Sequence, residues 1–221
     1  PLQNPTKPSP RLLKLARKIP QILKTPNWEH TLNEKIQEEE EEIPSILSQI
    51  PNPDSALVSF HWAHHLRSPW APPPDSLSYS ALLKNLAHHN LFREIESVLQ
   101  TMETHQISPT HEAFSTLIGA YSRFGSDEKA VGLFSSMKEK VGSFPDVVDC
   151  NCLLKLLVEK GRFELALNMY DEMLERGLAN NYSTCIAVRG LCLQGRVDGA
   201  KKLIEDRWGA GALRMLCFTT R

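Results

Sequence analysis

Hydrophobic residues along this chain recur at the spacing of paired amphipathic helices. Two successive stretches carry the pattern, the first at Phe114, Leu117, Ile118 and Tyr121, and the second at Ala130, Leu133, Phe134 and Met137. Intervals of three and four residues place side chains on one face of an α-helix. Gly125 separates the stretches, because glycine readily adopts the left-handed conformation that ends a helix, and Ser126 suits the start of the next. The pattern predicts two helices that pack through these faces.

This predicted helix pair is repeated at an interval of about 35 residues. A glycine, an alanine, an aromatic residue and a methionine follow in the same order at Gly125, Ala130, Phe134 and Met137, and again at Gly161, Ala166, Tyr170 and Met173. Weaker copies read Asn90, Ile95, Leu99 and Met102, and Gly195, Ala200, Ile204 and Arg207. A repeat of this length is typical of helical solenoids, in which each unit packs only on its neighbours. We therefore predict an all-α solenoid of stacked antiparallel helix pairs.

The repeat divides the chain into segments. Four regular units are expected at residues 76–110, 111–146, 147–180 and 181–214, and the last becomes irregular after residue 208. A degenerate helix pair is expected at residues 43–75, with apolar faces at Ile46, Leu47 and Ile50 and at Ala56, Leu57, Phe60 and Trp62. Residues 1–42 read as a tail that is first basic and then acidic. It holds a short helix that ends at Pro20 and the acidic run Glu38–Glu42.

Charge and composition limit the partners and the compartment. The net charge of −1 over 221 residues argues against a polycation that binds any nucleic acid through its phosphates. No apolar run approaches the roughly 18 residues that a membrane helix needs, so no membrane partner is expected. The first 28 residues contain no Asp or Glu and six lysines and arginines. Acid-poor basic N-termini occur in organelle transit peptides, so we expect the mitochondrion, with the chloroplast or an ordinary basic tail as alternatives.

Nothing in the sequence predicts catalysis. Phosphate-binding glycine loops, nucleophile elbows and HExxH motifs are absent, as is the zinc deaminase signature. The pairs Cys150 and Cys152, and Cys185 and Cys192, do not have zinc-finger spacing. An odd number of cysteines, five in all, favours reduced thiols in a helical core. We expect no enzyme activity, metal, cofactor or small-molecule substrate.

The repeats resemble a known family. The segments AFSTLIGAYSRFGSDEKAVGLFSSMKEK and DCNCLLKLLVEKGRFELALNMYDEMLERG closely resemble plant pentatricopeptide repeats of the P class, and GLCLQGRVDGAKKLIEDRW fits a further copy. PDSALVSFHWA resembles the segment that often precedes the regular repeats in that family. Tetratricopeptide repeats have a similar period but expect a Trp and a Gly-x2-Tyr early in each unit, which the repeats of this chain lack. The resemblance covers residues 44–208 and implies a right-handed α-solenoid, an α-α superhelix.

The resemblance also implies a binding site for single-stranded RNA, in which each repeat contacts one base. In the family, a polar residue early in the first helix and the last residue of the repeat face the base. Here these pairs would be Ser80 with Thr110, Ser115 with Asp146, and Asn151 with Asn180 or Asn181. Residues expected to wedge against the bases are Leu77, Val148 and Tyr182, whereas Glu112 fits that role poorly and Cys185 replaces the polar residue of the fourth repeat.

The family correspondence gives each pair a base preference. Ser115 with Asp146 favours guanine, and Asn151 with Asn favours a pyrimidine, cytosine first. Ser80 with Thr110 departs from the common pairs. The alternative for each residue is a structural one, because Ser, Asn, Asp and Thr near helix starts are common caps and turn formers.

Two functions follow from these observations. The first is an RNA-binding adaptor in organelle RNA processing, stabilisation or translation, which acts by occupying a defined single strand of organellar RNA. The second is a protein-interaction solenoid, such as a structural component of an organellar ribosome or RNA-processing complex. After Trp208 the residues do not start another repeat, although a shifted reading frame of a back-translated sequence would. We therefore expect the front part of a longer protein, cut short by a frameshift or gene-model error.

Overall fold

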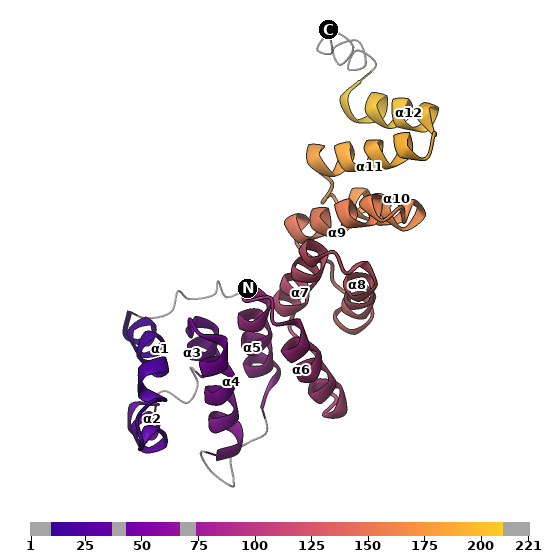
Figure 1. The fold of residues 1–221 in the computed structure, drawn as a ribbon. Helices are drawn as coiled ribbons and strands as arrows, with labels where there is room; N and C mark the ends of the chain where they lie inside the picture. Colours follow the sequence, from indigo (N-terminus) through magenta and orange to yellow (C-terminus); the bar gives the residue numbers. More distant parts are fainter. Residues whose placement is uncertain (1–9, 37–42, 67–73, 210–221) are drawn as a thin grey trace. The chain divides into compact units, whose positions relative to one another are not determined.

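A computed structural model describes residues 10–36, 43–66 and 74–209, which form helices and connecting turns (Figure 1). Twelve α-helices lie within these ranges: α1 Pro10–Ile22, α2 Trp28–Ile36, α3 Ile43–Gln49, α4 Pro53–His61, α5 Ser76–His88, α6 Phe92–Thr104, α7 His111–Phe124, α8 Asp127–Val141, α9 Val147–Glu159, α10 Phe163–Glu175, α11 Asn181–Leu193 and α12 Val197–Trp208. A π-helical turn, Trp62–Leu66, follows α4. The predicted all-α fold is confirmed. The acidic run Glu38–Glu42 and the irregular C-terminal end after Gly209 lie outside the described residues.

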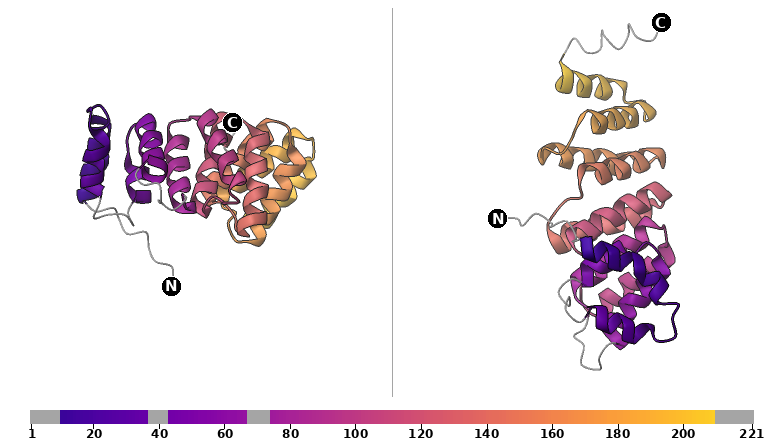
Figure 2. Two further views of the ribbon diagram at one scale, coloured as in Figure 1. Left: turned by 90° about the horizontal axis from the view of Figure 1, so that it is seen from below. Right: turned by 90° about the vertical axis from the view of Figure 1, so that its left-hand side faces the viewer.

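The described residues form two compact units, 1–117 and 118–221, whose boundary falls inside α7. In the first unit, α3 contacts both α1 and α5, and α5 contacts its partner α6. In the second unit, α9 contacts α11, and each of these two helices also contacts its own partner, α10 or α12 (Figure 2). Each unit is therefore a stack in which the first helices of successive pairs touch one another.

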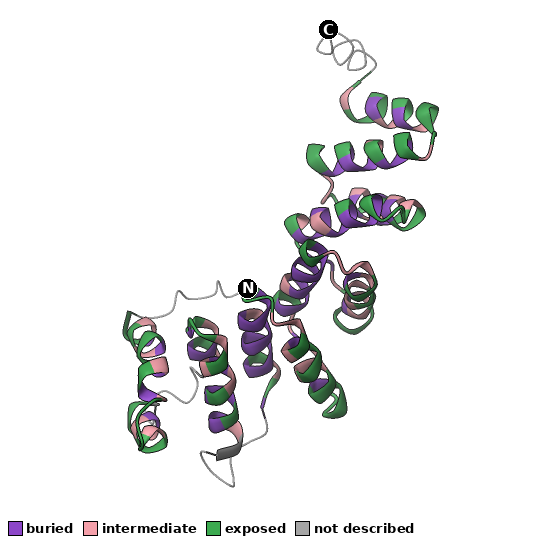
Figure 3. Cartoon of the chain, viewed as in Figure 1, coloured by how far each residue is buried: buried purple, intermediate pink, exposed green. Residues whose placement is uncertain are grey.

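Helices α5, α7, α9 and α11 begin at Ser76, His111, Val147 and Asn181, which are the first residues of the four expected units. We refer to α5–α6, α7–α8, α9–α10 and α11–α12 as the first to fourth regular pairs. Along each helix, buried positions recur next to exposed ones, as the amphipathic pattern requires (Figure 3). The recurring alanine of the second helix is almost completely buried in three pairs, with Ala130, Ala166 and Ala200 at 0%, 1% and 3% exposed.

The turn inside each regular pair contains one residue in the left-handed conformation. Gly125, Gly161 and Gly195 have φ of 88°, 72° and 74°, and Asn90 takes their place in the first pair with φ of 57°. Residues with a Cβ rarely adopt this conformation, but Asn tolerates it better than most. The conformation explains why the sequence repeats a glycine here and why its one replacement is an asparagine.

Residues 10–36 contribute a helix pair where the sequence suggested a tail. Helix α1 extends to Ile22 through Pro20, so the expectation that Pro20 ends it is wrong. Its residues Leu12, Ala16 and Ile19 are at most 3% exposed, and α1 contacts α3. Ile19 and Leu32 line one small apolar cavity together with Ile46, Leu47 and Trp62 of the next pair. The apolar side of this basic segment therefore belongs to the core of the first unit.

Candidate functional site

The residues expected to read bases share one position, the fifth of the first helix in each regular pair. Ser80, Ser115 and Asn151 occupy it in α5, α7 and α9, and they are 3%, 4% and 7% exposed. Each directly follows a buried core residue, Tyr79, Phe114 or Cys150. Cys185 holds the same position in α11 and is exposed. In α5, α7 and α9 the fifth position thus lies at the edge of the core, where only a small part of the residue reaches the surface.

The residues expected to wedge against bases lie three positions earlier on the same helices. Leu77, Val148 and Tyr182 are 58%, 63% and 56% exposed, although each is large and apolar. Residues three apart share a helix face. Apolar side chains exposed at the same register on three helices therefore stand beside the fifth position of each.

The last residue of each repeat caps the following helix. Asp146 accepts hydrogen bonds at Oδ1 from the backbone N–H groups of Val148 and Asp149, both at 2.9 Å. Thr110 caps α7 through a contact of 3.4 Å from the Ala113 N–H to its Oγ1, as the sequence predicted. Asn180 caps α11 by accepting the Ser183 N–H at 2.9 Å. These side chains are therefore held at the helix starts by capping, whatever else they bind.

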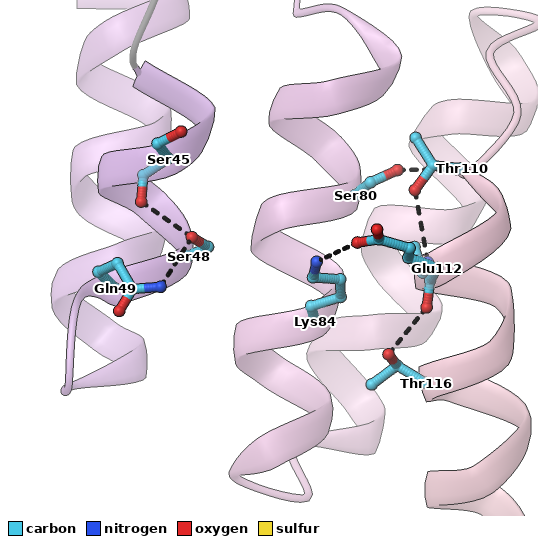
Figure 4. A network of polar contacts seen from close by, with 9 residues as sticks. Ser45, Ser48, Gln49, Ser80, Lys84, Thr110, Glu112 and Thr116 are labelled. Atoms are coloured by element: carbon cyan, nitrogen blue, oxygen red, sulfur yellow. Dashed lines mark hydrogen bonds and ion pairs between the residues drawn. The ribbon is translucent and has the colours of Figure 1, made fainter. Parts of the chain in front are cut away.

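In the first unit, the structure brings Ser80 and Thr110 together. The backbone N–H of Thr110 donates to Ser80 Oγ at 2.9 Å (Figure 4). On the same side, Lys84 Nζ donates to Glu112 Oε2 at 2.8 Å. This hydrogen bond and the charge of Lys84 hold the pKa of Glu112 below its ordinary value. The residue that fits the wedge role poorly is thus ionised and paired across two helices.

In the second unit, the structure links Asn151 to Asn180 through a third residue. Ser183 Oγ lies 2.7 Å from Asn151 Oδ1 and 3.0 Å from Asn180 Oδ1. Asn181 instead accepts a hydrogen bond from Trp208 Nε1 at 3.1 Å. Of the two asparagines that the sequence offered as partners for Asn151, Asn180 is the one connected to it. Ser115 and Asp146 lie in different units, at the start of α7 and before α9.

Sequence reasoning missed Ser183, which is completely buried. A signal for it was present, since Asn180 and Ser183 form a capping box, the reciprocal pattern of an N-cap residue and the third residue of a helix. It also missed Asp149, which is 8% exposed and lies against Gly119. A glycine inside a helical pattern is the available sign of such a close approach.

The described residues contain no group of three or more His, Cys, Asp or Glu side chains placed to hold a metal ion. Burial raises the pKa of the Cys150 thiol to about 12, and the charges of Asp146 and Asp149 add to the effect. This thiol stays protonated near neutral pH and is a weak nucleophile. None of the helices described combines the length and the apolar character that spanning a bilayer requires.

Comparison with known families matches three parts of the chain. Residues 73–124 match the pentatricopeptide repeat domain, residues 112–140 the PPR repeat, and residues 145–193 the PPR repeat family. Together the matches extend from the first regular pair into α11.

Several curated proteins of Arabidopsis thaliana are similar to this chain. The pentatricopeptide repeat-containing protein At1g52620 is 37% identical over 216 residues, which is 95% of this chain and 26% of that protein. At2g18940, a chloroplastic protein of the same description, is 36% identical over 45% of this chain and 12% of its own length. The mitochondrial At2g18520 is 24% identical over 80% of this chain and 42% of its own length. The chain thus spans about a quarter of the length of At1g52620.

Solved structures share the fold. The crystal structure of the maize pentatricopeptide repeat protein PPR10 superposes with a TM-score of 0.61 at 16% identity, covering 84% of this chain and 27% of that one. PPR10 in complex with an 18-nucleotide psaJ RNA element superposes with a TM-score of 0.59 at 20% identity, covering 91% of this chain and 29% of that one. These likenesses confirm the predicted solenoid of stacked helix pairs.

Proposed function

This chain belongs to the pentatricopeptide repeat family, and on that premise we propose that it binds single-stranded RNA, with one base at each regular helix pair. One observation carries the proposal. An exposed apolar residue and, three positions later, a polar residue recur at the same places of α5 and α9, as Leu77 with Ser80 and Val148 with Asn151. A base needs both features, a surface for its face and hydrogen-bonding groups for its edge.

Helix capping, the structural alternative to RNA binding, explains only part of this pattern. Capping accounts for Asp146, Asn180 and Thr110, because their side chains bind backbone N–H groups. It does not account for Leu77, Val148 and Tyr182, which expose more than half of their surface. Folding alone gives no reason to place large apolar side chains in water at one register of α5, α9 and α11. Contact with nucleobases gives such a reason.

The repeats differ in what they offer a base. Asn151 with Asn180 suits a pyrimidine, cytosine first, and for Ser115 with Asp146 the family resemblance predicts guanine. Ser80 with Thr110 has no assigned base, and the thiol of Cys185 is a weak hydrogen-bonding group. Since the whole chain carries a net charge of −1, selectivity comes from these side chains and not from general attraction to phosphates.

The biological role that follows is an adaptor in organelle RNA processing, stabilisation or translation, which occupies its RNA without catalysis. Relatives described as chloroplastic and mitochondrial support an organelle as the site of action. A complex of PPR10 with a psaJ RNA element supports RNA as the partner. We place the protein in the mitochondrion, with the chloroplast as the alternative.

Selection of RNAs from a randomised pool tests the function. The purified chain is expected to enrich a short motif, and a variant with Leu77, Val148 and Tyr182 all changed to Ser is expected to enrich none while keeping its helical circular dichroism. Val58→Ser is the matched control, because Val58 is also apolar and exposed but lies outside the regular pairs. Failure of the chain to enrich any motif, together with capture of proteins from an organelle extract, would favour a protein-interaction solenoid instead.

A further inference from the structure

The Asn151 amide is bound by a residue of the next helix pair. Ser183, the third residue of α11, has no exposed surface and places its Oγ 2.7 Å from Asn151 Oδ1. Ser183 Oγ also accepts a hydrogen bond from the backbone N–H of Asn180 at 3.3 Å. Ser183 therefore joins the two residues that the proposed function assigns to one base.

Ser183 contacts the oxygen of the Asn151 amide. A serine hydroxyl has one proton to donate. Two amide oxygens lie within reach of this proton, Asn151 Oδ1 at 2.7 Å and Asn180 Oδ1 at 3.0 Å, and the shorter distance is the ordinary length of an O–H···O bond. The proton is therefore donated to Asn151 Oδ1. The Nδ2 group of Asn151, which forms no hydrogen bond within the described part of the chain, is left as a donor.

The first unit shows the same arrangement independently. Ser80 Oγ accepts the backbone N–H of Thr110, the residue that caps the next helix pair, at 2.9 Å. Its hydroxyl proton has no partner among the residues that the structure describes. In both units a donor beside the start of the next pair, the Thr110 N–H before α7 or the Ser183 hydroxyl in α11, binds the oxygen of the fifth residue and leaves that residue with hydrogen to donate.

We propose that Ser183 determines the base preference of the third regular pair by holding Asn151 as a hydrogen-bond donor, an inference that rests on the proposed RNA-binding function. Two N–H groups suit a base with adjacent acceptors. Cytosine offers N3 and O2 side by side, whereas in uracil an N–H group separates the two carbonyl oxygens. Adenine and guanine each present one acceptor on the same edge. Ser183 is a positioning residue, because it acts through Asn151 and is itself covered.

The test uses the whole chain and RNAs randomised at each position of the selected motif. Asn151→Ala first identifies the nucleotide that Asn151 contacts. Ser183→Ala is then expected to reduce the preference for cytosine at that nucleotide by about tenfold, with little change at the others. Ser78→Ala is the matched control, since Ser78 is the third residue of α5 and is 3% exposed, and it should leave that nucleotide unaffected.

Two further variants make the outcome decisive. The double variant Asn151→Ala with Ser183→Ala should show the same base preference at that nucleotide as Asn151→Ala alone, because Ser183 acts only through Asn151. Asn151→Asp replaces the donor by an acceptor without touching Ser183, so it should lose the cytosine preference even if Ser183→Ala fails to fold. If the wild-type chain shows no base preference anywhere, the proposed function fails. If it prefers cytosine and Ser183→Ala or Asn151→Asp keeps that preference, the role of Ser183 is refuted while the proposed function stands.

Discussion

The backbone of Gly119 in α7 lies directly against the carboxylate of Asp149 in α9. A Cβ atom added to Gly119 would fall 1.8 Å from Asp149 Oδ1 and 2.6 Å from its Cγ. Asp149 is 8% exposed and forms an ion pair with Arg123 of α7 at 3.5 Å. Gly119 and Arg123 lie one turn apart on α7 and both meet this carboxylate, so the contact between α7 and α9 depends on the absence of a side chain at residue 119.

Gly119→Ala is expected to destabilise the chain by about 1–3 kcal/mol, because the added methyl group must displace a nearly buried carboxylate. Denaturation in urea measures the change. Gly132→Ala is the control, since Gly132 lies inside α8 with no other atom near its missing Cβ, and it should stabilise the chain by roughly 0.5–1 kcal/mol. Stabilisation by both substitutions would contradict the close contact.

Ala166→Phe tests the approach of the two helices in the third regular pair. Ala166 is 1% exposed, and a phenyl ring there would force α9 and α10 apart. Overpacking of this kind costs about 1–3 kcal/mol and occasionally more, and we expect the upper part of that range. Leu165→Phe, at a neighbouring residue that is 39% exposed, should change the melting temperature little. Equal melting temperatures for the two variants would show that the pair is not tightly packed at Ala166.

Ile19→Ala tests whether α1 is part of the fold. Ile19 is completely buried, so removing its side-chain atoms should cost about 2–5 kcal/mol of unfolding free energy. The exposed Arg17 provides the control, because Arg17→Ala removes a long side chain from the same helix without opening a cavity. Thermal unfolding measures the effect. If residues 10–22 were a basic tail without contacts, neither variant would change the melting temperature.

Lys84→Met should raise the pKa of Glu112 toward its ordinary value, since the hydrogen bond and the charge that lower it are removed. A carboxyl group with a lowered pKa in the folded state adds stability above its unfolded pKa, and this stability is lost as the pH falls through the folded pKa. The pair is largely exposed, so the effect on stability should be small. Titration of Glu112 by NMR measures the shift, and Lys155→Met should leave it unchanged.

The repeating elements were predictable because each depends on local sequence. Gly125 and Ala130 recur in the order that one turn and one close helix contact require, and the structure places both as expected. The length of α1 and its place in the core were not predicted. Its few apolar residues have a structural role only because they pack against α3, which is a contact between separate segments. The capping box marks Ser183 in the sequence, but its contact with Asn151 could not be foreseen, since that contact joins residues 32 apart and depends on how α9 and α11 pack.

The hydrogen bond between Ser183 and Asn151 also has a practical consequence for engineering. If repeats were cut and joined at their sequence boundaries, the third would arrive in a new array without the serine that orients its asparagine. A transplanted module should therefore run from the start of α9 through the first turn of α11, and chimeras built on shorter blocks would inherit their specificity partly from whichever neighbour they meet.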